Sequence, residues 1–292
     1  MPKFTYLKPK TVEEACSMLH RHNGKAIVIA GGTDLVVRMK RKLVMPDYLI
    51  DITYIPGLDK VEYDEKRGLN IGALCPHTDI ESSRLILEKF SILAQAANSI
   101  GSTQVRNLGT IGGNLCNAAP SADSAPALLV LDAEARIFGF KGERMLKLTE
   151  FFSGPGETAL KPDEILTSIE VPNLLAHSAA VYLKQNPRKA MDIAVVGVAV
   201  VLWLAAEGSI CSDIRIALGA VAPTPIRAKT AEDMLRGKTL DESLIREAAK
   251  AASEEAKPIS DIRSIAQYRK EIVEVLTRRC IQQTNEKTQM TF

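Results

Sequence analysis

The sequence GSTQVRNLGTIGGNLCNAAPSADSAP, residues 101–126, contains four glycines and many small polar residues, and few bulky side chains occur before the apolar run that begins at Ala127. Glycine lets the main chain approach a ligand where a Cβ atom would collide, and consecutive backbone N–H groups in a turn form a concave anion site. The stretch therefore predicts an exposed backbone that binds a phosphate-bearing ligand.

A second stretch of the same kind, VIAGGTDL, occupies residues 28–35, between a β-branched run and an amphipathic segment. Two such loops can hold the two ends of one diphosphate. Neither contains the G-x-G-x-x-G of a dinucleotide Rossmann site or the G-x-x-x-x-G-K-[ST] of a P-loop, so a nucleotide fold here is of another kind. Taken alone, each Gly-Gly pair is more often a plain turn, and that alternative stays open.

The composition is that of an ordinary globular protein, with 292 residues, 46% hydrophobic and 25% charged. The net charge of +2 gives no argument for nucleic acid or an anionic membrane as a partner. We found no apolar span long enough for a membrane and no signal-peptide core, which predicts a soluble, cytoplasmic protein. The five cysteines lack cluster spacing, so we expect buried thiols and no metal site.

The first 54 residues predict an α/β unit: a helix behind a Thr11 cap, a strand at 25–30, a helix at 35–42 and a strand at 48–52. Strands are predicted at 61–63, 69–74 and 165–171, with a hairpin at 135–140 and 144–148. Helices are predicted from a Thr78 cap toward Ile86 and at 92–100.

The C-terminal part has a different pattern, with β-rich runs at 180–185, 193–204 and 214–221 followed only then by helices. A Thr239 capping box opens the first of these helices and the second covers 266–282, while the last ~8 residues are expected to fray. This order predicts an antiparallel sheet with helices, and we place the domain boundary within residues 173–178.

No catalytic residue is predicted. The four histidines lie near no nucleophile motif, and His77, just before a predicted cap, is expected at the surface. The paired carboxylates lie on helices that look solvated, which disfavours a hydrolase. A flavin protein needs none of these groups, since the cofactor itself accepts and passes electrons.

The motifs AGGTDL at residues 30–35 and TIGGN at 110–114, with SAD at 121–123 and a proline close after, resemble the two FAD-binding loops of the medium subunit of molybdenum hydroxylases. That family includes the FAD subunits of xanthine dehydrogenase and carbon monoxide dehydrogenase. The resemblance continues at GPG 154–156, DEIL 163–166, KQ 184–185 with DIA 192–194, and GAVAPTP 219–225, in matching order.

The resemblance implies an α+β protein. Residues 1–175 would form a two-part α/β FAD-binding domain of the vanillyl-alcohol-oxidase/p-cresol-methylhydroxylase type, with subdomains 1–54 and 55–175. Residues 178–284 would form an antiparallel-sheet-plus-helices C-terminal domain of the CO-dehydrogenase flavoprotein type.

The resemblance also implies the cofactor site. Backbone N–H groups of both stretches would wrap the diphosphate and ribityl chain, and Asp123 would accept hydrogen bonds from flavin-side hydroxyls, unless it only caps a helix. Lys184 would lie near the ring or phosphates, with a plain surface lysine as the alternative. The implied cofactor-binding residues are Val28, Ile29, Ala30, Gly31, Gly32, Thr33, Asp34, Leu35, Gly101, Val105, Thr110, Gly112, Gly113, Asn114, Asn117, Asp123, Ile165, Leu166 and Lys184.

The implied function is electron transfer through non-covalent FAD, because neither stretch holds a histidine for covalent attachment. Electrons would leave a molybdenum-cofactor large subunit, cross the [2Fe-2S] clusters of a small subunit, and pass through this flavin to NAD or another acceptor, in a dimer of heterotrimers. The alternatives are a stand-alone flavin-dependent oxidase or dehydrogenase of the same superfamily and a scaffold that has lost its cofactor.

Overall fold

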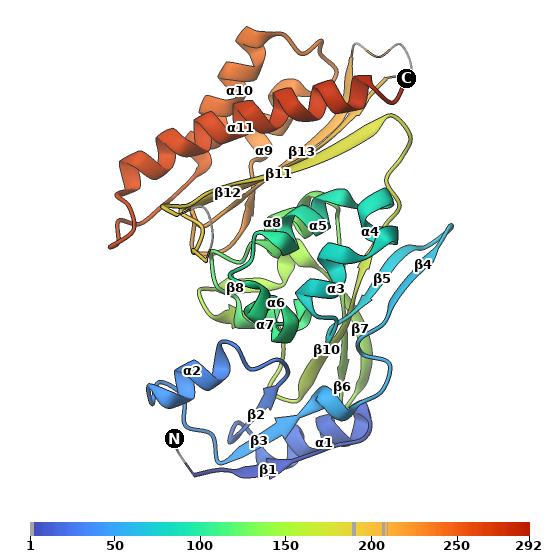
Figure 1. The fold of residues 1–292 in the computed structure, drawn as a ribbon, viewed down its shortest axis with the longest axis vertical. Helices are drawn as coiled ribbons and strands as arrows, with labels where there is room; N and C mark the ends of the chain where they lie inside the picture. Colours follow the sequence, from blue (N-terminus) through green and yellow to red (C-terminus); the bar gives the residue numbers. More distant parts are fainter. Residues whose placement is uncertain (1–2, 189–190, 206–207, 209) are drawn as a thin grey trace. The chain divides into compact units, whose positions relative to one another are not determined.

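The structure is a computed structural model that describes residues 3–188, 191–205, 208 and 210–292. The chain forms two compact units, each assembled from three segments (Figure 1). The first unit comprises Met1–Asp79, Thr103–Ala118 and Ala133–Pro172, and the second comprises Ile80–Ser102, Ala119–Asp132 and Asn173–Phe292. The domain limits 1–175 and 178–284 stay a prediction.

The first unit begins with a three-stranded parallel sheet in the order β1-β3-β2. Its elements are β1 (Thr5–Leu7), α1 (Val12–His22), β2 (Ala26–Ile29), α2 (Leu35–Lys40) and β3 (Tyr48–Asp51). The Thr11 hydroxyl accepts the Glu14 N–H, as predicted, whereas the Glu14 carboxylate accepts from Lys10 N–H and not from Thr11. The predicted helix–strand–helix–strand order is confirmed.

A five-stranded antiparallel sheet in the order β4-β5-β10-β6-β7 completes the first unit. The strands are β4 (Val61–Asp64), β5 (Gly68–Gly72), β6 (Glu134–Gly139), β7 (Gly142–Lys147) and β10 (Glu164–Val171), and a small pair is formed by β8 (Phe152–Gly154) and β9 (Glu157–Thr158). Helix α1 contacts both sheets, because Ala15, Cys16 and Leu19 pack in one core with Ile50 of β3 and Ile165 of β10.

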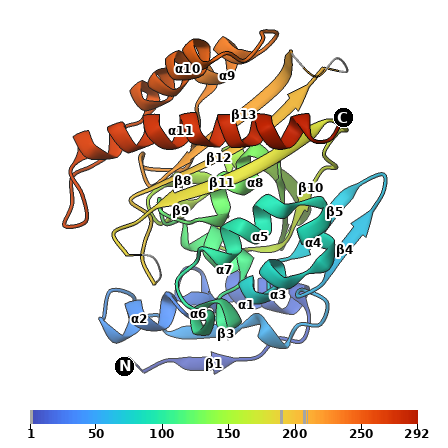
Figure 2. The same cartoon turned by 45° about the horizontal axis from the view of Figure 1, so that its top comes forward.

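The second unit is built around an antiparallel sheet of β11 (Ser178–Gln185), β12 (Val196–Leu204), β13 (Cys211–Gly219) and β14 (Ile226–Arg227). All nine residues of β12 are buried, which requires both faces of the sheet to be covered. Helices α9 (Lys229–Leu235), α10 (Glu242–Glu255) and α11 (Ala266–Gln289) cover one face (Figures 1 and 2). The other face packs on α5 (Ser91–Asn98) and α8 (Ser124–Val130).

Several predicted helix limits are wrong. The helix expected from a Thr78 cap is two helices, α3 (His77–Ser82) and α4 (Arg84–Lys89), because Ser83 leaves the helical conformation and its hydroxyl caps α4. Helix α10 is capped by the Asp241 carboxylate and not by Thr239, and the short helix α9 had no clear periodic signal.

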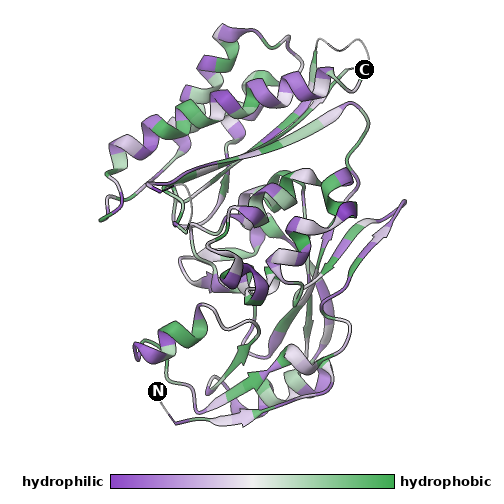
Figure 3. Ribbon diagram, in the orientation of Figure 1, coloured by the Kyte–Doolittle hydropathy of each residue, from purple (hydrophilic) through white to green (hydrophobic). Residues whose placement is uncertain are grey.

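The expected fraying at the C-terminus is also wrong. Helix α11 continues to Gln289, and the Thr284 and Thr288 side chains are fully buried, each hydroxyl donating to the carbonyl four residues earlier. Hydrophilic and hydrophobic residues alternate along α11 (Figure 3), so one face of this polar segment covers the sheet while the other meets solvent.

Candidate functional site

The first glycine-containing stretch leaves the edge strand β2 and enters α2. Gly32 has a φ of +71°, a conformation that side chains disfavour. Within the described part of the chain, the backbone N–H groups of Gly32, Thr33 and Asp34 have no hydrogen-bond acceptor. Successive unpaired N–H groups in a tight turn are suited to an anion such as a diphosphate.

The two glycine-containing stretches meet in the first unit. A Cβ atom on Gly31 would lie 1.7 Å from the carbonyl oxygen of Leu108, and one on Gly109 would lie 3.5 Å from Thr33 Oγ1. Main chain therefore packs directly on main chain, and only glycine fits at Gly31. The structure thus brings together two predicted site segments that are about 75 residues apart in sequence.

The second stretch is not the open loop that its composition predicts. It folds into α6 (Thr103–Leu108), α7 (Ile111–Asn117) and the start of α8. The N–H groups of Ile111 and Gly112 donate to Cys75 O and Ala73 O, and that of Gly113 donates to the Thr110 hydroxyl. The expectation that these N–H groups are free for a ligand is therefore wrong, since the first two hold the stretch against residues 73–77 and the third takes part in the cap of α7.

The adjacent glycines of α7 have different surroundings. A Cβ atom on Gly112 would lie 2.6 Å from both the carbonyl oxygen and the Cβ atom of Ala73, so this glycine is required for packing. A Cβ atom on Gly113 would approach only Thr110 Oγ1, at 3.0 Å. Gly113 therefore has the more open side, where a ligand can approach.

His77 is a residue that the sequence analysis placed wrongly. Only 2% of it is exposed, and its backbone N–H donates to Gly109 O at 3.0 Å. Burial, together with the Arg106 charge, lowers the pKa of His77 to about 4, so the ring is neutral near pH 7. Its position depends on the pairing of residues 73–77 with 109–112, which no local pattern reveals.

Two further predicted residues, Asp123 and Lys184, form a buried ion pair in the second unit. Lys184 Nζ lies 2.8 Å from Asp123 Oδ2, and the two side chains are 7% and 8% exposed. The other Asp123 oxygen accepts the Tyr182 hydroxyl at 2.7 Å, while Lys184 also donates to Ser99 O and Asp192 O. Lys184 is therefore not a plain surface lysine.

The same contacts bear on the alternative role of Asp123. Its side chain makes no capping hydrogen bond to α8, so the helix-cap alternative is wrong. Burial raises the pKa of the Asp123 carboxyl, and the Lys184 ammonium and the two hydrogen bonds oppose that shift. The carboxyl oxygens are both engaged by protein groups in this network.

The remaining predicted residues lie in two groups. In the first unit, Asn114 and Asn117 are half-buried on α7, Val105 is exposed on α6, and Ile165 and Leu166 are each 3% exposed on β10. Gly101 belongs to the second unit and has a φ of +44°.

A metal site or a membrane span would each leave a recognisable feature in the described residues. No group of three or more His, Cys, Asp or Glu side chains there could hold a metal ion, and none of the described helices is long and apolar enough to cross a membrane. Four cysteines are buried as expected, and Cys116 is half-buried.

Two glycine-containing segments packed together, the first of which has three unpaired backbone N–H groups, fit a protein that binds a phosphate-bearing cofactor. The family described as "FAD binding domain in molybdopterin dehydrogenase" matches residues 2–174, and "CO dehydrogenase flavoprotein C-terminal domain" matches residues 181–284. The chain belongs to the FAD-binding medium subunits of the molybdenum hydroxylase family, which makes it an oxidoreductase subunit with FAD as its cofactor.

Individual relatives agree with this assignment over almost the whole chain. The glyceraldehyde dehydrogenase medium chain of Sulfolobus acidocaldarius is 35% identical, with 97% of this chain and 98% of the relative covered. The structure of carbon monoxide dehydrogenase from Hydrogenophaga pseudoflava has a TM-score of 0.94 at 34% identity, covering 98% of both chains. Quinoline 2-oxidoreductase from Pseudomonas putida 86 gives a TM-score of 0.91 at 30% identity, covering 99% of both. The predicted α+β fold class and the resemblance are thereby confirmed.

Proposed function

We propose that this chain binds one FAD non-covalently and relays electrons from the [2Fe-2S] clusters of a partner subunit to NAD or another acceptor. The observation that carries the proposal is the set of unpaired N–H groups at Gly32, Thr33 and Asp34 beside Gly109. Such groups bind the diphosphate of a dinucleotide without any cationic side chain.

The residues present fit FAD in unequal ways. The first stretch supplies free N–H donors and the Thr33 hydroxyl, whereas the second supplies the open side of Gly113 and the half-buried amides of Asn114 and Asn117. We assign the diphosphate to the first stretch and propose that the second shapes the wall of the site. When bound, the flavin accepts and passes electrons, and the protein binds and orients it.

The remaining predicted site residues stay part of this proposal. Asp123 and Lys184 would act as one hydrogen-bonded pair, because each already neutralises the other. Ile165 and Leu166 would form an apolar backing, since both side chains are buried on β10.

We propose partners from the names of the relatives. The matched proteins from Hydrogenophaga pseudoflava and Eubacterium barkeri are a "medium chain" and an "FAD-subunit", words that describe parts of larger enzymes. This chain would pair with an iron–sulfur small subunit and a molybdenum-cofactor large subunit in the cytoplasm, as a dimer of heterotrimers. Oxidation of the organic substrate would then take place on the large subunit.

The test is to purify the chain alone, load it with FAD and remove unbound flavin. We expect about one FAD per chain, released into the supernatant on acid precipitation, because the contacts are non-covalent. The loaded chain should reduce a dye with NADH as donor if NAD is the natural acceptor. It should not turn over purines, aldehydes or carbon monoxide.

Two results would count against the proposal. Flavin that stays with the acid pellet would contradict non-covalent binding, and turnover of any of those substrates by the lone chain would favour a stand-alone oxidase over a relay subunit.

A further inference from the structure

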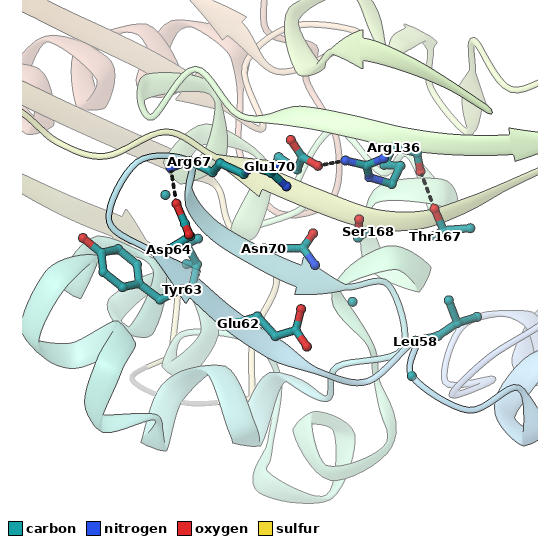
Figure 4. Close-up of a pocket in the computed structure, with 14 residues that line it drawn as sticks. Leu58, Glu62, Tyr63, Asp64, Arg67, Asn70, Arg136, Thr167, Ser168 and Glu170 are labelled. Atoms are coloured by element: carbon teal, nitrogen blue, oxygen red, sulfur yellow. Dashed lines mark hydrogen bonds and ion pairs between the residues drawn. The ribbon is translucent and has the colours of Figure 1, made fainter.

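The five-stranded sheet of the first unit carries a groove of about 490 Å³ on its polar face (Figure 4). The groove is lined by β4, β5, β10 and β6 and by the loop at Gly57 and Leu58. No residue that we place in the FAD site lines it. Its size suits a small ligand or one side chain of a partner protein.

The groove follows from the alternation of side chains along β5. Gly68, Asn70 and Gly72 point to the polar face, whereas Leu69 and Ile71 are 1% exposed or less on the apolar face. Because the two glycines have no side chains, the Asn70 side chain stands alone on this face of its strand. A Cβ atom on Gly72 would lie 2.2 Å from Leu58 O, so the loop lies directly over this end of the strand.

Asn70 has an unsatisfied acceptor in this groove. Its Oδ1 atom is buried and has no hydrogen-bond partner within the described chain. The strand register places Glu62 of β4 and Glu170 of β10 directly opposite Asn70, one on each side. Figure 4 shows the Glu62 and Asn70 side chains lying along the same groove. A row of oxygen acceptors with one unmet bond favours a ligand that is a hydrogen-bond donor.

The charges of the groove favour a cation. Arg136 forms ion pairs with Glu143 and Glu170, so its charge is neutralised. Backbone hydrogen bonds from Arg67 and Lys66 lower the pKa of the Asp64 carboxyl, and the Arg67 charge adds to that shift. Among the described lining residues, Glu62 is the carboxylate that remains without an ion-pair partner.

We propose that this groove binds a primary ammonium or guanidinium group, with Asn70 Oδ1 and the Glu62 carboxylate as its acceptors. These groups carry several N–H donors and one positive charge, which matches what the groove lacks. The group belongs either to a free small amine or to a lysine or arginine side chain of a partner subunit.

The experiment measures agmatine binding to the FAD-loaded chain by calorimetry, and in parallel the co-purification of the partner subunits. The variants are Glu62→Gln and Asn70→Leu, with Glu65→Gln in the neighbouring hairpin turn as the matched charge control. If the group is a free amine, agmatine binds saturably and each groove variant weakens it by about tenfold or more, while the control does not. If it is a partner side chain, the groove variants reduce recovery of the complex and the control does not.

Unchanged agmatine affinity and unchanged complex recovery in both groove variants would overturn the proposal. Glu62 is exposed on β4, so Glu62→Gln leaves folding intact and keeps the test decisive if Asn70→Leu proves unstable. The flavin content of each variant is read from its absorbance, which separates a failure of this site from a failure of the FAD site.

Discussion

The two glycine-containing stretches look alike in sequence and differ in structure. Residues 28–35 leave three consecutive backbone N–H groups without an acceptor in the described chain, whereas residues 111–113 use theirs to hold α7 in place. Gly31 and Gly112 each allow main chain to approach protein atoms. A Gly-Gly pair therefore signals close packing as readily as it signals a ligand, and only the hydrogen bonds separate the two roles.

The comparison predicts that a substitution that breaks the contacts around the second stretch lowers the free energy of unfolding more than it lowers the affinity for the cofactor. The largest expected effect is for Lys184→Met, which leaves the Asp123 carboxylate at the end of this stretch buried without its cation. Breaking a buried pair in this way costs about 3–5 kcal/mol. Urea unfolding of the flavin-free protein would measure the loss.

The pH dependence of Lys184→Met gives an independent reading of the same pair. Without the ammonium, burial raises the pKa of Asp123 further, so the folded state keeps a proton that the unfolded state has lost. Stability of the variant should then fall as pH rises above the ordinary aspartate pKa of about 4. The double variant with Asp123→Asn should recover most of the loss; no recovery would mean that the pair is not the cause.

A further prediction concerns His77, whose backbone N–H donates to Gly109 O in the second stretch. Its folded pKa of about 4 is below the ordinary value of 6.5, so the unfolded state takes up a proton first as pH falls. The neutral ring thus contributes stability that is present above pH 6.5 and is lost toward pH 4, by about 3 kcal/mol in all. In His77→Phe the free energy of unfolding should decline less between these pH values. An unchanged decline would mean that other groups cause it.

The smallest and sharpest test compares the adjacent glycines of α7. Gly112→Ala should destabilise the protein by about 1–3 kcal/mol, since its Cβ atom overlaps Ala73. Gly113→Ala should destabilise the flavin-free protein less, because its Cβ atom would approach only the Thr110 hydroxyl, at 3.0 Å, and alanine favours a helix. If a ligand approaches Gly113, that variant should still lose FAD, as read from flavin absorbance after gel filtration. Equal melting temperatures for the two variants would contradict the difference in their surroundings.

Local patterns predicted those parts of the fold whose signals are local. The hairpin of β6 and β7 follows from alternation around Lys141-Gly142, and α1 follows from its Thr11 cap. The composition of residues 101–126 did not predict α6 and α7, and α7 in particular is held by hydrogen bonds to residues 73–77 that lie far from it in the sequence.

The candidate site shows the same limit. The sequence pointed to Asp123 and Lys184 separately, but they are 61 residues apart, and their ion pair exists only through the tertiary structure of the second unit. No local pattern marks Asn70 and Glu62, since Asn70, with a glycine two residues away on each side, resembles part of an ordinary strand until the register places carboxylates beside it.

The six alternating segments of the two units restrict how this protein can be made. A ribosome that has released residues 1–175 has supplied α5 and α8 but not the sheet of the second unit that they cover. Every residue of α8 is buried in the finished protein, so its apolar side chains have no sheet to cover until β12 and β13 emerge. Completion of the second unit therefore waits until β12 and β13 have emerged, and a nascent chain stalled before that point exposes an apolar surface that chaperones bind.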